Sequence, residues 1–409
     1  MDKIEAQYSA RLSKGIKIYN MNNKTRNQHY VPCFYLNGFA NDKKFWAYDF
    51  SKCRMIPNMV DIYSQCVKAY FYGEDGIWEQ RLSNMEREWA IVLKKVVGGR
   101  KLMSNEVILL KRFLLFQKLR TSSTANYLQN DRESILLEWA KSVYISKGWV
   151  FGEEAKKFCR DRAKEKVTPA ENVELADQLY SYIDDLNTLI VHYNTTRKLL
   201  VSDSPVIALN AFLKCYGFGL NNIGIAFIMP LSPEYLLIVY DAKIYRDNSD
   251  NIYQESTNEE DVETINKYLL INAERMVYSN DKSSFELVTQ EIYDYRDQEY
   301  NRNQVQFLGP EGTNRLMINN AHGTNYYFKL SFLKLPREYS RIPFVCREMI
   351  PRTFESGWDI KLAKKYKVLS ATICNDKINE KINKYKISRT ELKLGCRWME
   401  KLARIYWER

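Results

Sequence analysis

The sequence is poor in the residues that build metal and disulfide sites. It has only three histidines, His29, His192 and His322, and its eight cysteines are scattered without a Cys-x-x-Cys pair. A structural zinc site, which needs clustered Cys and His ligands, is therefore not expected. Scattered single cysteines are typical of reduced, mostly buried thiols, which agrees with a cytoplasmic chain.

Long apolar runs are also missing. No stretch approaches the roughly 18 uninterrupted apolar residues of a membrane span. The basic first 20 residues are not followed by the apolar segment of a secretory signal. We therefore expect a cytoplasmic protein that does not contact a membrane. The signatures GxGxxG, GxxxxGK[ST], GxSxG and HExxH are absent as well, so neither a nucleotide-binding loop nor a common hydrolase motif is indicated.

Charge is distributed unevenly along the chain. The sequence has 61 Lys and Arg against 50 Asp and Glu, a formal net charge of +11. Residues 331–409 hold 19 basic and 9 acidic side chains, whereas the preceding 330 residues are nearly balanced. A local basic excess attracts polyanions, so nucleic acid is the expected partner of this C-terminal region. A solvated basic region without such a partner is the alternative.

The order of patterns along the chain predicts an α+β fold. At 409 residues two or three domains are expected, and a hydrophobic content of 45% supplies their cores. Helical patterns prevail to about residue 186, and strand patterns with one helix follow. We predict a basic arm (1–28), an α+β domain (29–282), a polar, loop-rich linker-like region (283–330) and a basic, helical C-terminal region (331–409).

Apolar spacing and capping signals predict the helices. A stripe that recurs every three or four residues predicts a helix from about 76 to 97; it comprises Trp78, Leu82, Met85, Trp89, Val92 and Val96. A denser apolar run predicts a buried helix from Ser104, a favourable N-cap, to about Arg120. A third helix is expected from about 131 to 147. Capping boxes at 168–171 and 257–260 begin helices to about 185 and 274, respectively.

Runs rich in β-branched and aromatic residues predict the strands. They cover residues 45–50, 189–192, 199–201, 225–229, 235–240 and 276–278. Two proline-containing turns, Ser202-Asp203-Ser204-Pro205 and Leu231-Ser232-Pro233, separate them.

Several short motifs occur in an order that resembles a known family. Gln28-His29-Tyr30-Val31-Pro32 is the first. It is followed by Phe71-Tyr72 before the helix with Glu79 and Glu86, by Gln117 and Arg120 at the end of the next helix, and by the turn at 201–206. In this order they resemble the bacterial domain-of-unknown-function family 4238 over about residues 26–282. Cys33 and Ser204 depart from the residues expected there. The resemblance implies no established activity, but it directs attention to these polar residues.

Two glutamates of the first helix are candidate metal ligands. Glu79 and Glu86 are seven residues apart, so both side chains point nearly the same way, with Leu82 between them. Carboxylates placed in this way could hold Mg²⁺ or divide acid and base roles. Alternatively, they are surface glutamates that balance Arg81 and Arg87.

His29 and Arg120 are candidates for proton transfer and phosphate binding. Histidine suits proton transfer near neutral pH, but it could equally fix its segment through a backbone hydrogen bond. Arg120 and Gln117 are three apart on one face of an apolar helix. The arginine could bind a phosphate, or it could form a buried ion pair with Glu79 or Glu86. Tyr30 is, with Gln117, a candidate substrate contact.

The turn after a predicted strand supplies the remaining candidates. Asp203 could be a metal ligand or a base, and Ser202 a substrate contact, because loops present functional groups. The alternative for Asp203 is an Asx-turn that satisfies its own backbone before Pro205. His192 and Arg197 are residue types found in metal-independent RNA cleavage, but they lie in strand-like sequence and are assigned no role.

The leading hypothesis is a metal-dependent phosphodiesterase that cleaves nucleic acid, as a bacterial defence or toxin effector. Glu79, Glu86 and Asp203 would bind Mg²⁺, His29 would transfer a proton, and Arg120 would stabilise phosphate charge. The alternative is a non-catalytic nucleic-acid-binding or protein-binding sensor module in which these side chains form an internal ion-pair network. The first hypothesis predicts one open cleft, and the second predicts dry, mutually paired groups.

Overall fold

The computed structural model describes residues 26–124, 150–164, 169–212, 223–245, 252–300 and 329–336, the segments 304–307 and 316–319, and the isolated positions 133, 136, 137, 140, 148 and 220. Helices and several sheets are both present in this part of the chain, which confirms the α+β class. The expected N-terminal arm, the helix at 131–147 and the basic C-terminal region lie almost entirely outside the described residues. Within these residues, no helix is long and apolar enough to cross a membrane.

The helices largely follow the capping and spacing signals. They are α2 (Cys33–Leu36), α3 (Ile77–Val97), α4 (Ser104–Leu119), α6 (Glu153–Ala163), α7 (Pro169–Leu179), α8 (Glu259–Asn272) and α9 (Gln290–Tyr300), with 3-10 turns at Asn37–Phe39, Ile62–Ser64, Tyr180–Tyr182 and Lys282–Leu287. Helix α8 begins within the predicted capping segment 257–260, but its cap is Asn258 and not Thr257: the Asn258 side chain accepts hydrogen bonds from the backbone N–H groups of Glu260 and Asp261.

Two expectations about helices were wrong. Ser104 is the first helical residue of α4 and not its N-cap; Met103 occupies that position, and the Glu106 carboxylate accepts a hydrogen bond from its N–H at 2.9 Å. The region from 283 to 330 is not simply loop. It contains α9, in which the isoleucine Ile292 is fully buried. The high polarity of α9 hid a helix that needs only a narrow apolar contact with the domain.

The strands form two five-stranded sheets and two small ribbons. The strands are β1 (Asn27–His29), β2 (Lys44–Asp49), β3 (Arg54–Met55), β4 (Val60–Asp61), β5 (Val67–Ala69), β6 (Asn187–Tyr193), β7 (Val201–Ser202), β8 (Ile207–Leu209), β9 (Ala226–Pro230), β10 (Tyr235–Tyr240), β11 (Tyr253–Ser256), β12 (Met276–Ser279), β13 (Gln304–Phe307) and β14 (Leu316–Asn319). The ribbons are β1–β5 and β13–β14. Eight strands of at most four residues each were not predicted: β1, β3, β4, β5, β8, β11, β13 and β14.

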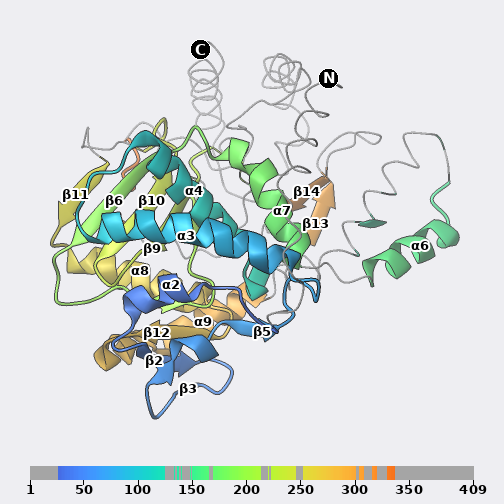
Figure 1. Ribbon diagram of the computed structural model, residues 1–409. Helices are drawn as coiled ribbons and strands as arrows, with labels where there is room; N and C mark the ends of the chain where they lie inside the picture. Colours follow the sequence, from blue (N-terminus) through green and yellow to red (C-terminus); the bar gives the residue numbers. More distant parts are fainter. Residues whose placement is uncertain are drawn as a thin grey trace.

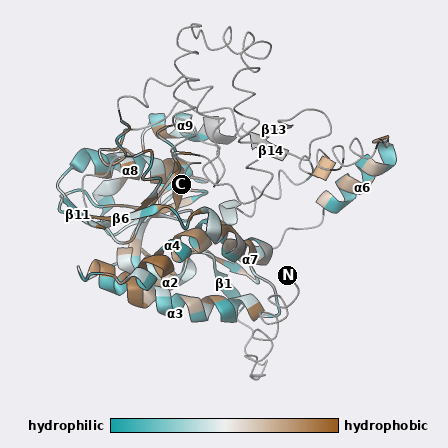
Figure 2. Cartoon of the chain, turned by 90° about the horizontal axis from the view of Figure 1, so that it is seen from above, coloured by the Kyte–Doolittle hydropathy of each residue, from teal (hydrophilic) through white to brown (hydrophobic). Residues whose placement is uncertain are grey.

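The first large sheet has the order β11-β6-β10-β9-β8 and is antiparallel except for the parallel pair β11–β6. Helices α3 and α4 cover one of its faces and α8 the other (Figures 1 and 2). Successive residues of β10 therefore enter different cores: Leu237 packs on the α3–α4 side and Leu236 on the α8 side. A strand covered on both faces explains why 235–240 is an unbroken hydrophobic run.

The second sheet, with the order β3-β2-β12-β7 and β4 also paired to β2, joins distant parts of the chain. Trp46 on β2 lies opposite Ser279 on β12. A bidentate ion pair from Arg275 to the buried carboxylate of Asp49, at 3.0 and 2.6 Å, fixes the same junction. This pairing holds β1, β5 and α2 beside α3 and α4, where most of the candidate residues lie.

One glycine of the fold predicts a measurable loss of stability. Gly224 has a φ of +75°, and a Cβ there would lie 2.7 Å from the Cβ of buried Phe212. We expect Gly224→Ala to lower the free energy of unfolding by about 2–3 kcal/mol, from backbone strain and overpacking together. Gly76→Ala is the matched control, since Gly76 has a φ of +73° but open space around it. Equal losses in urea denaturation of the two variants would contradict the steric part.

Candidate functional site

Arg120 is the centre of a buried polar network. It lies at the C-terminal end of α4 and is 2% exposed. Its Nε donates to the Tyr72 hydroxyl at 3.0 Å, its Nη1 to Glu86 Oε1 at 2.7 Å, and its Nη2 to the His29 carbonyl oxygen at 2.7 Å. The three partners come from three different segments, so one guanidinium joins α3, α4, the β1 strand and the loop before α3.

Packing between α3 and α4 places Glu86 within reach of Arg120. The α3 stripe confirms the predicted apolar face, because Leu82, Trp89 and Val96 are buried. The centroid of the Trp89 ring system lies 5.3 Å from the ring centroid of Phe113 and 5.4 Å from that of Phe116, both on α4. These contacts fix how the two helices are rotated against one another. The buried ion pair with Glu86, which was the structural alternative for Arg120, is present.

His29 is half-buried at the end of β1 and has a defined protonation pattern. Its Nε2 lies 3.1 Å from the carbonyl oxygen of Tyr63. A carbonyl only accepts, so Nε2 carries the proton and the Nδ1 lone pair of the neutral ring remains available. Burial lowers the pKa of His29 below its usual value, opposed by the hydrogen bond to Tyr63 and the nearby Glu86 carboxylate.

This geometry predicts a neutral His29 at pH 7. In a long-range ¹H–¹⁵N NMR titration, we expect His29 to appear as the Nε2–H tautomer, with a pKa below 6.5. The sequence has only three histidines, and His29→Gln assigns the resonance. A measured pKa of 6.5 or above, or the Nδ1–H tautomer, would contradict the described environment.

Glu79 lies near this network without a hydrogen bond or ion pair to any described residue. Its side chain is half-buried, and its pKa is raised by burial first and then by the negative charge of Glu86. Cys33 lies in the same neighbourhood: burial, together with the carboxylates of Glu86, Asp61 and Glu79, raises its pKa to about 11. The thiol is therefore protonated at neutral pH and is not an activated nucleophile.

Gln117 and Tyr30 connect α4 to the β1–β5 ribbon. The Gln117 side chain is fully buried, and its Nε2 donates to the Tyr30 carbonyl oxygen at 3.1 Å. Its Oε1 has no hydrogen-bond partner among the described residues. The Tyr30 side chain points to a different place, beside the buried thiol of Cys66, and burial raises its pKa strongly. Gln117 and Tyr30, two of the three candidate substrate contacts, thus take part in internal packing.

Asp203 belongs to a second cluster and not to the Arg120 network. It is 1% exposed. Its carboxylate accepts hydrogen bonds from the N–H groups of Glu274 (2.9 Å), Arg275 (2.8 Å) and Met276 (2.8 Å). Burial raises the pKa of Asp203 to about 6, while the three backbone donors oppose that rise. The Asx-turn alternative was wrong about the partner, since the carboxylate binds a segment about seventy residues away.

Ser202, and not Asp203, accepts the local backbone hydrogen bond of this turn. Its Oγ accepts a hydrogen bond from the Ser204 N–H at 3.2 Å, and the serine is fully buried. The same segment is held from α8, because the Asn272 side chain donates to the Ser204 carbonyl oxygen at 2.7 Å. The Ser-Asp-x-Pro turn is thus a junction between β7, α8 and β12.

The donor set of the leading hypothesis does not fit a metal ion. Glu86 is bound to Arg120, and Asp203 accepts hydrogen bonds from three backbone N–H groups in another cluster. Elsewhere in the described part of the chain, too, no three His, Cys, Asp or Glu side chains are grouped so that they could hold a metal. Of the expected set, the structure therefore brings His29, Glu86 and Arg120 together with Glu79 beside them, and it separates Asp203.

Sequence reasoning missed two residues that complete these clusters. Tyr72 is buried and accepts the Nε hydrogen bond of Arg120. Burial raises the pKa of Tyr72 to about 12, and the charge and hydrogen bond of Arg120 oppose that rise. Tyr278 is fully buried on β12 and lies 3.5 Å, hydroxyl to Sγ, from Cys66. Phe71-Tyr72 carried a signal as part of the family resemblance.

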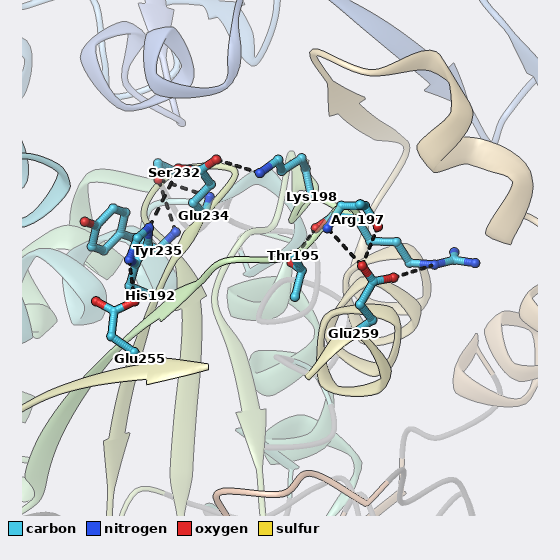
Figure 3. A network of polar contacts seen from close by, with 10 residues as sticks. His192, Thr195, Arg197, Lys198, Ser232, Glu234, Tyr235, Glu255 and Glu259 are labelled. Atoms are coloured by element: carbon cyan, nitrogen blue, oxygen red, sulfur yellow. Dashed lines mark hydrogen bonds and ion pairs between the residues drawn. The ribbon is translucent and has the colours of Figure 1, made fainter. Parts of the chain in front are cut away.

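His192 and Arg197 do not form a joint site. Figure 3 shows that His192 pairs with Glu255, whereas Arg197 points to Glu259 on α8. The His192 Nδ1 is 2.7 Å from Glu255 Oε2, and its ring stacks on that of Tyr235 with centroids 4.4 Å apart. These contacts belong to a charged surface network and agree with the absence of an assigned role.

No curated protein and no solved structure matches the chain significantly. The family model described as "Protein of unknown function (DUF4238)" matches residues 27–283, more than half of the chain. This span begins at β1 and ends just after β12, so it contains both the Arg120 network and the Asp203 junction. The chain therefore belongs to the DUF4238 family.

Proposed function

We propose that this protein is a non-catalytic nucleic-acid-binding module in which the polar network around Arg120 has a structural role. The observation that carries the proposal is the state of Arg120: its guanidinium is almost completely buried and bound on three sides by protein groups. An arginine in this state cannot bind a phosphate without breaking the ion pair that joins α3 to α4. Asp203 is likewise committed to backbone donors.

Charge supports nucleic acid as the partner. The excess of 19 basic over 9 acidic residues in 331–409 provides many cations for phosphate contacts. Binding through phosphate contacts releases counterions, so affinity falls steeply with salt and depends little on base sequence. The family domain would then hold a fixed shape while the basic region binds the polyanion.

The test is binding of the full chain to labelled single-stranded RNA and duplex DNA at several salt concentrations. We expect the dissociation constant to rise at least about tenfold between roughly 50 and 200 mM salt, without cleavage of the nucleic acid. A variant with Lys361, Lys364, Lys365 and Lys367 replaced by Glu should lose at least about tenfold in affinity at low salt. Replacing the exposed Lys52, Arg54, Arg87 and Lys94 by Glu is the charge-matched control on the family domain. No binding at low salt, or equal losses in both variants, would refute the proposal.

Phosphodiester cleavage is the second candidate function, and the available Nδ1 of His29 favours it. A neutral imidazole with its other nitrogen fixed is a suitable general base, and Glu79 nearby has a raised pKa. The test is incubation of the protein with RNA and DNA, with and without Mg²⁺. Cleavage that His29→Gln abolishes and His192→Gln preserves would establish this function, whereas no cleavage by the wild type would end it.

A further inference from the structure

The β11 strand forms one edge of the first large sheet. Its backbone bonds to β6 from alternate residues: the Ile252 carbonyl oxygen accepts from Ile190 at 2.6 Å, and that of Ser256 accepts from Asn194 at 2.9 Å. Because this pattern has a period of two, the N–H and C=O groups of Tyr253 and Glu255 point away from the sheet. Among the described residues, no strand pairs with this outer side.

A hollow lies directly at this edge. It has a volume of about 220 Å³ and is lined by Lys101, Leu102, Ile252 and Tyr253. The Tyr253 hydroxyl donates to the Arg100 carbonyl oxygen at 2.8 Å, which fixes the ring against the loop between α3 and α4. Two aliphatic side chains, an aromatic ring and the methylene stem of a lysine suit an aliphatic group of a ligand.

The carboxylate of Glu255 lies next to the hollow along β11. Glu255 is two residues after Tyr253, so both side chains lie on the same face about 7 Å apart. The Glu255 side chain is 77% exposed, and its only described partner is His192 on the adjoining strand. Glu234, whose Oε2 lies 3.8 Å from His192 Nε2, is already ion-paired with Lys198 at 2.6 Å, so Glu255 is the carboxylate available at this end of the row (Figure 3).

We propose that the β11 edge binds an extended peptide segment of a partner protein, which joins the sheet as an additional strand. Backbone groups of the peptide pair with those of Tyr253 and Glu255, an aliphatic side chain enters the hollow, and a Lys or Arg two residues away lies beside Glu255. Strand addition uses main-chain bonds for affinity and alternate side chains for specificity. The exposed Glu255 carboxylate favours a basic peptide side chain over a phosphate at this edge, so the site is distinct from the basic region.

The proposal can be tested with the full chain and a fluorescein-labelled peptide, acetyl-Thr-Val-Thr-Leu-Thr-Lys-Thr-amide, by fluorescence anisotropy. Saturable binding is expected, with affinity lowered at least about fivefold when the peptide Lys becomes Glu or its Leu becomes Ser. N-methylation of the peptide bonds that face β11 should abolish binding, because it removes the main-chain donors while the protein stays unchanged. No saturable binding up to about 1 mM, or no effect of N-methylation, overturns the proposal.

A matched pair of variants separates the backbone from the side chain. Glu255→Ala and Glu255→Pro both remove the carboxylate, but only proline removes the outward N–H, and proline is tolerated at such edge positions. We expect Glu255→Pro to bind at least about tenfold more weakly than Glu255→Ala. Equal affinities of the two variants would contradict strand addition. Circular dichroism of both variants verifies that the sheet is retained.

Discussion

Replacing Arg120 by methionine is expected to lower the free energy of unfolding by about 3–5 kcal/mol, as found when one partner of a buried ion pair is removed. The substitution keeps most of the aliphatic stem but leaves three groups without their donor: the Glu86 carboxylate, the Tyr72 hydroxyl and the His29 carbonyl oxygen. The Glu86 side chain is 24% exposed and regains some hydration, which places the loss toward the lower end of the range.

Urea denaturation followed by circular dichroism measures this loss. Arg87→Met is the matched control, since Arg87 is an exposed arginine on α3 and its replacement should change stability by less than about 0.5 kcal/mol. If Arg120→Met unfolds within about 0.5 kcal/mol of Arg87→Met, the Arg120 network is not structural. The arginine would then be free for a role in binding.

Asp203→Ala should destabilise the protein by about 4 kcal/mol. Three backbone N–H groups, of Glu274, Arg275 and Met276, lose their acceptor, and each buried unsatisfied donor costs about 1–3 kcal/mol. The sum is reduced because Arg275 is partly exposed and water can reach its backbone. The loss should appear as detachment of β12, because these donors lie where α8 ends and β12 begins.

Asp281→Ala provides the comparison. The Asp281 side chain also accepts a backbone hydrogen bond, from the Ser283 N–H at 3.0 Å, but in an exposed turn. Such a cap contributes about 1 kcal/mol. Hydrogen exchange should show faster exchange of the Val277 and Tyr278 amides in Asp203→Ala than in Asp281→Ala. Equal unfolding free energies of the two variants would show that the junction does not depend on the carboxylate.

These two predictions bear directly on function. If both variants unfold easily while nucleic-acid binding by the folded protein remains, the polar groups around Arg120 and Asp203 maintain the fold and the binding surface lies elsewhere. If instead His29→Gln leaves stability unchanged but removes an activity, the half-buried region around His29 and Glu79 is the functional part of the network. The first outcome indicates a purely structural network, and the second indicates a functional site within it.

The sequence by itself determined the elements with strong local patterns. The α3 stripe from Trp78 to Val96 and the hydrophobic run of β10 formed as predicted, and α8 begins within the predicted capping segment 257–260. Each depends on neighbouring residues alone, since helix periodicity, β-branched content and capping act within a few positions. The grouping of candidate residues was correct only in part: Arg120, Glu86 and His29 lie together, whereas Asp203 belongs to another cluster.

Only the tertiary structure decided what those residues do. Spacing placed Glu79 and Glu86 on the same side of α3, yet only Glu86 pairs with Arg120. The sequence around Asp203 suggested a local turn, yet its partners follow α8. The polar helix α9 and the edge strand β11 had too little local pattern to be recognised. Hydrogen bonds and ion pairs between distant segments depend on how helices rotate and strands register, and these are fixed by packing of the whole core.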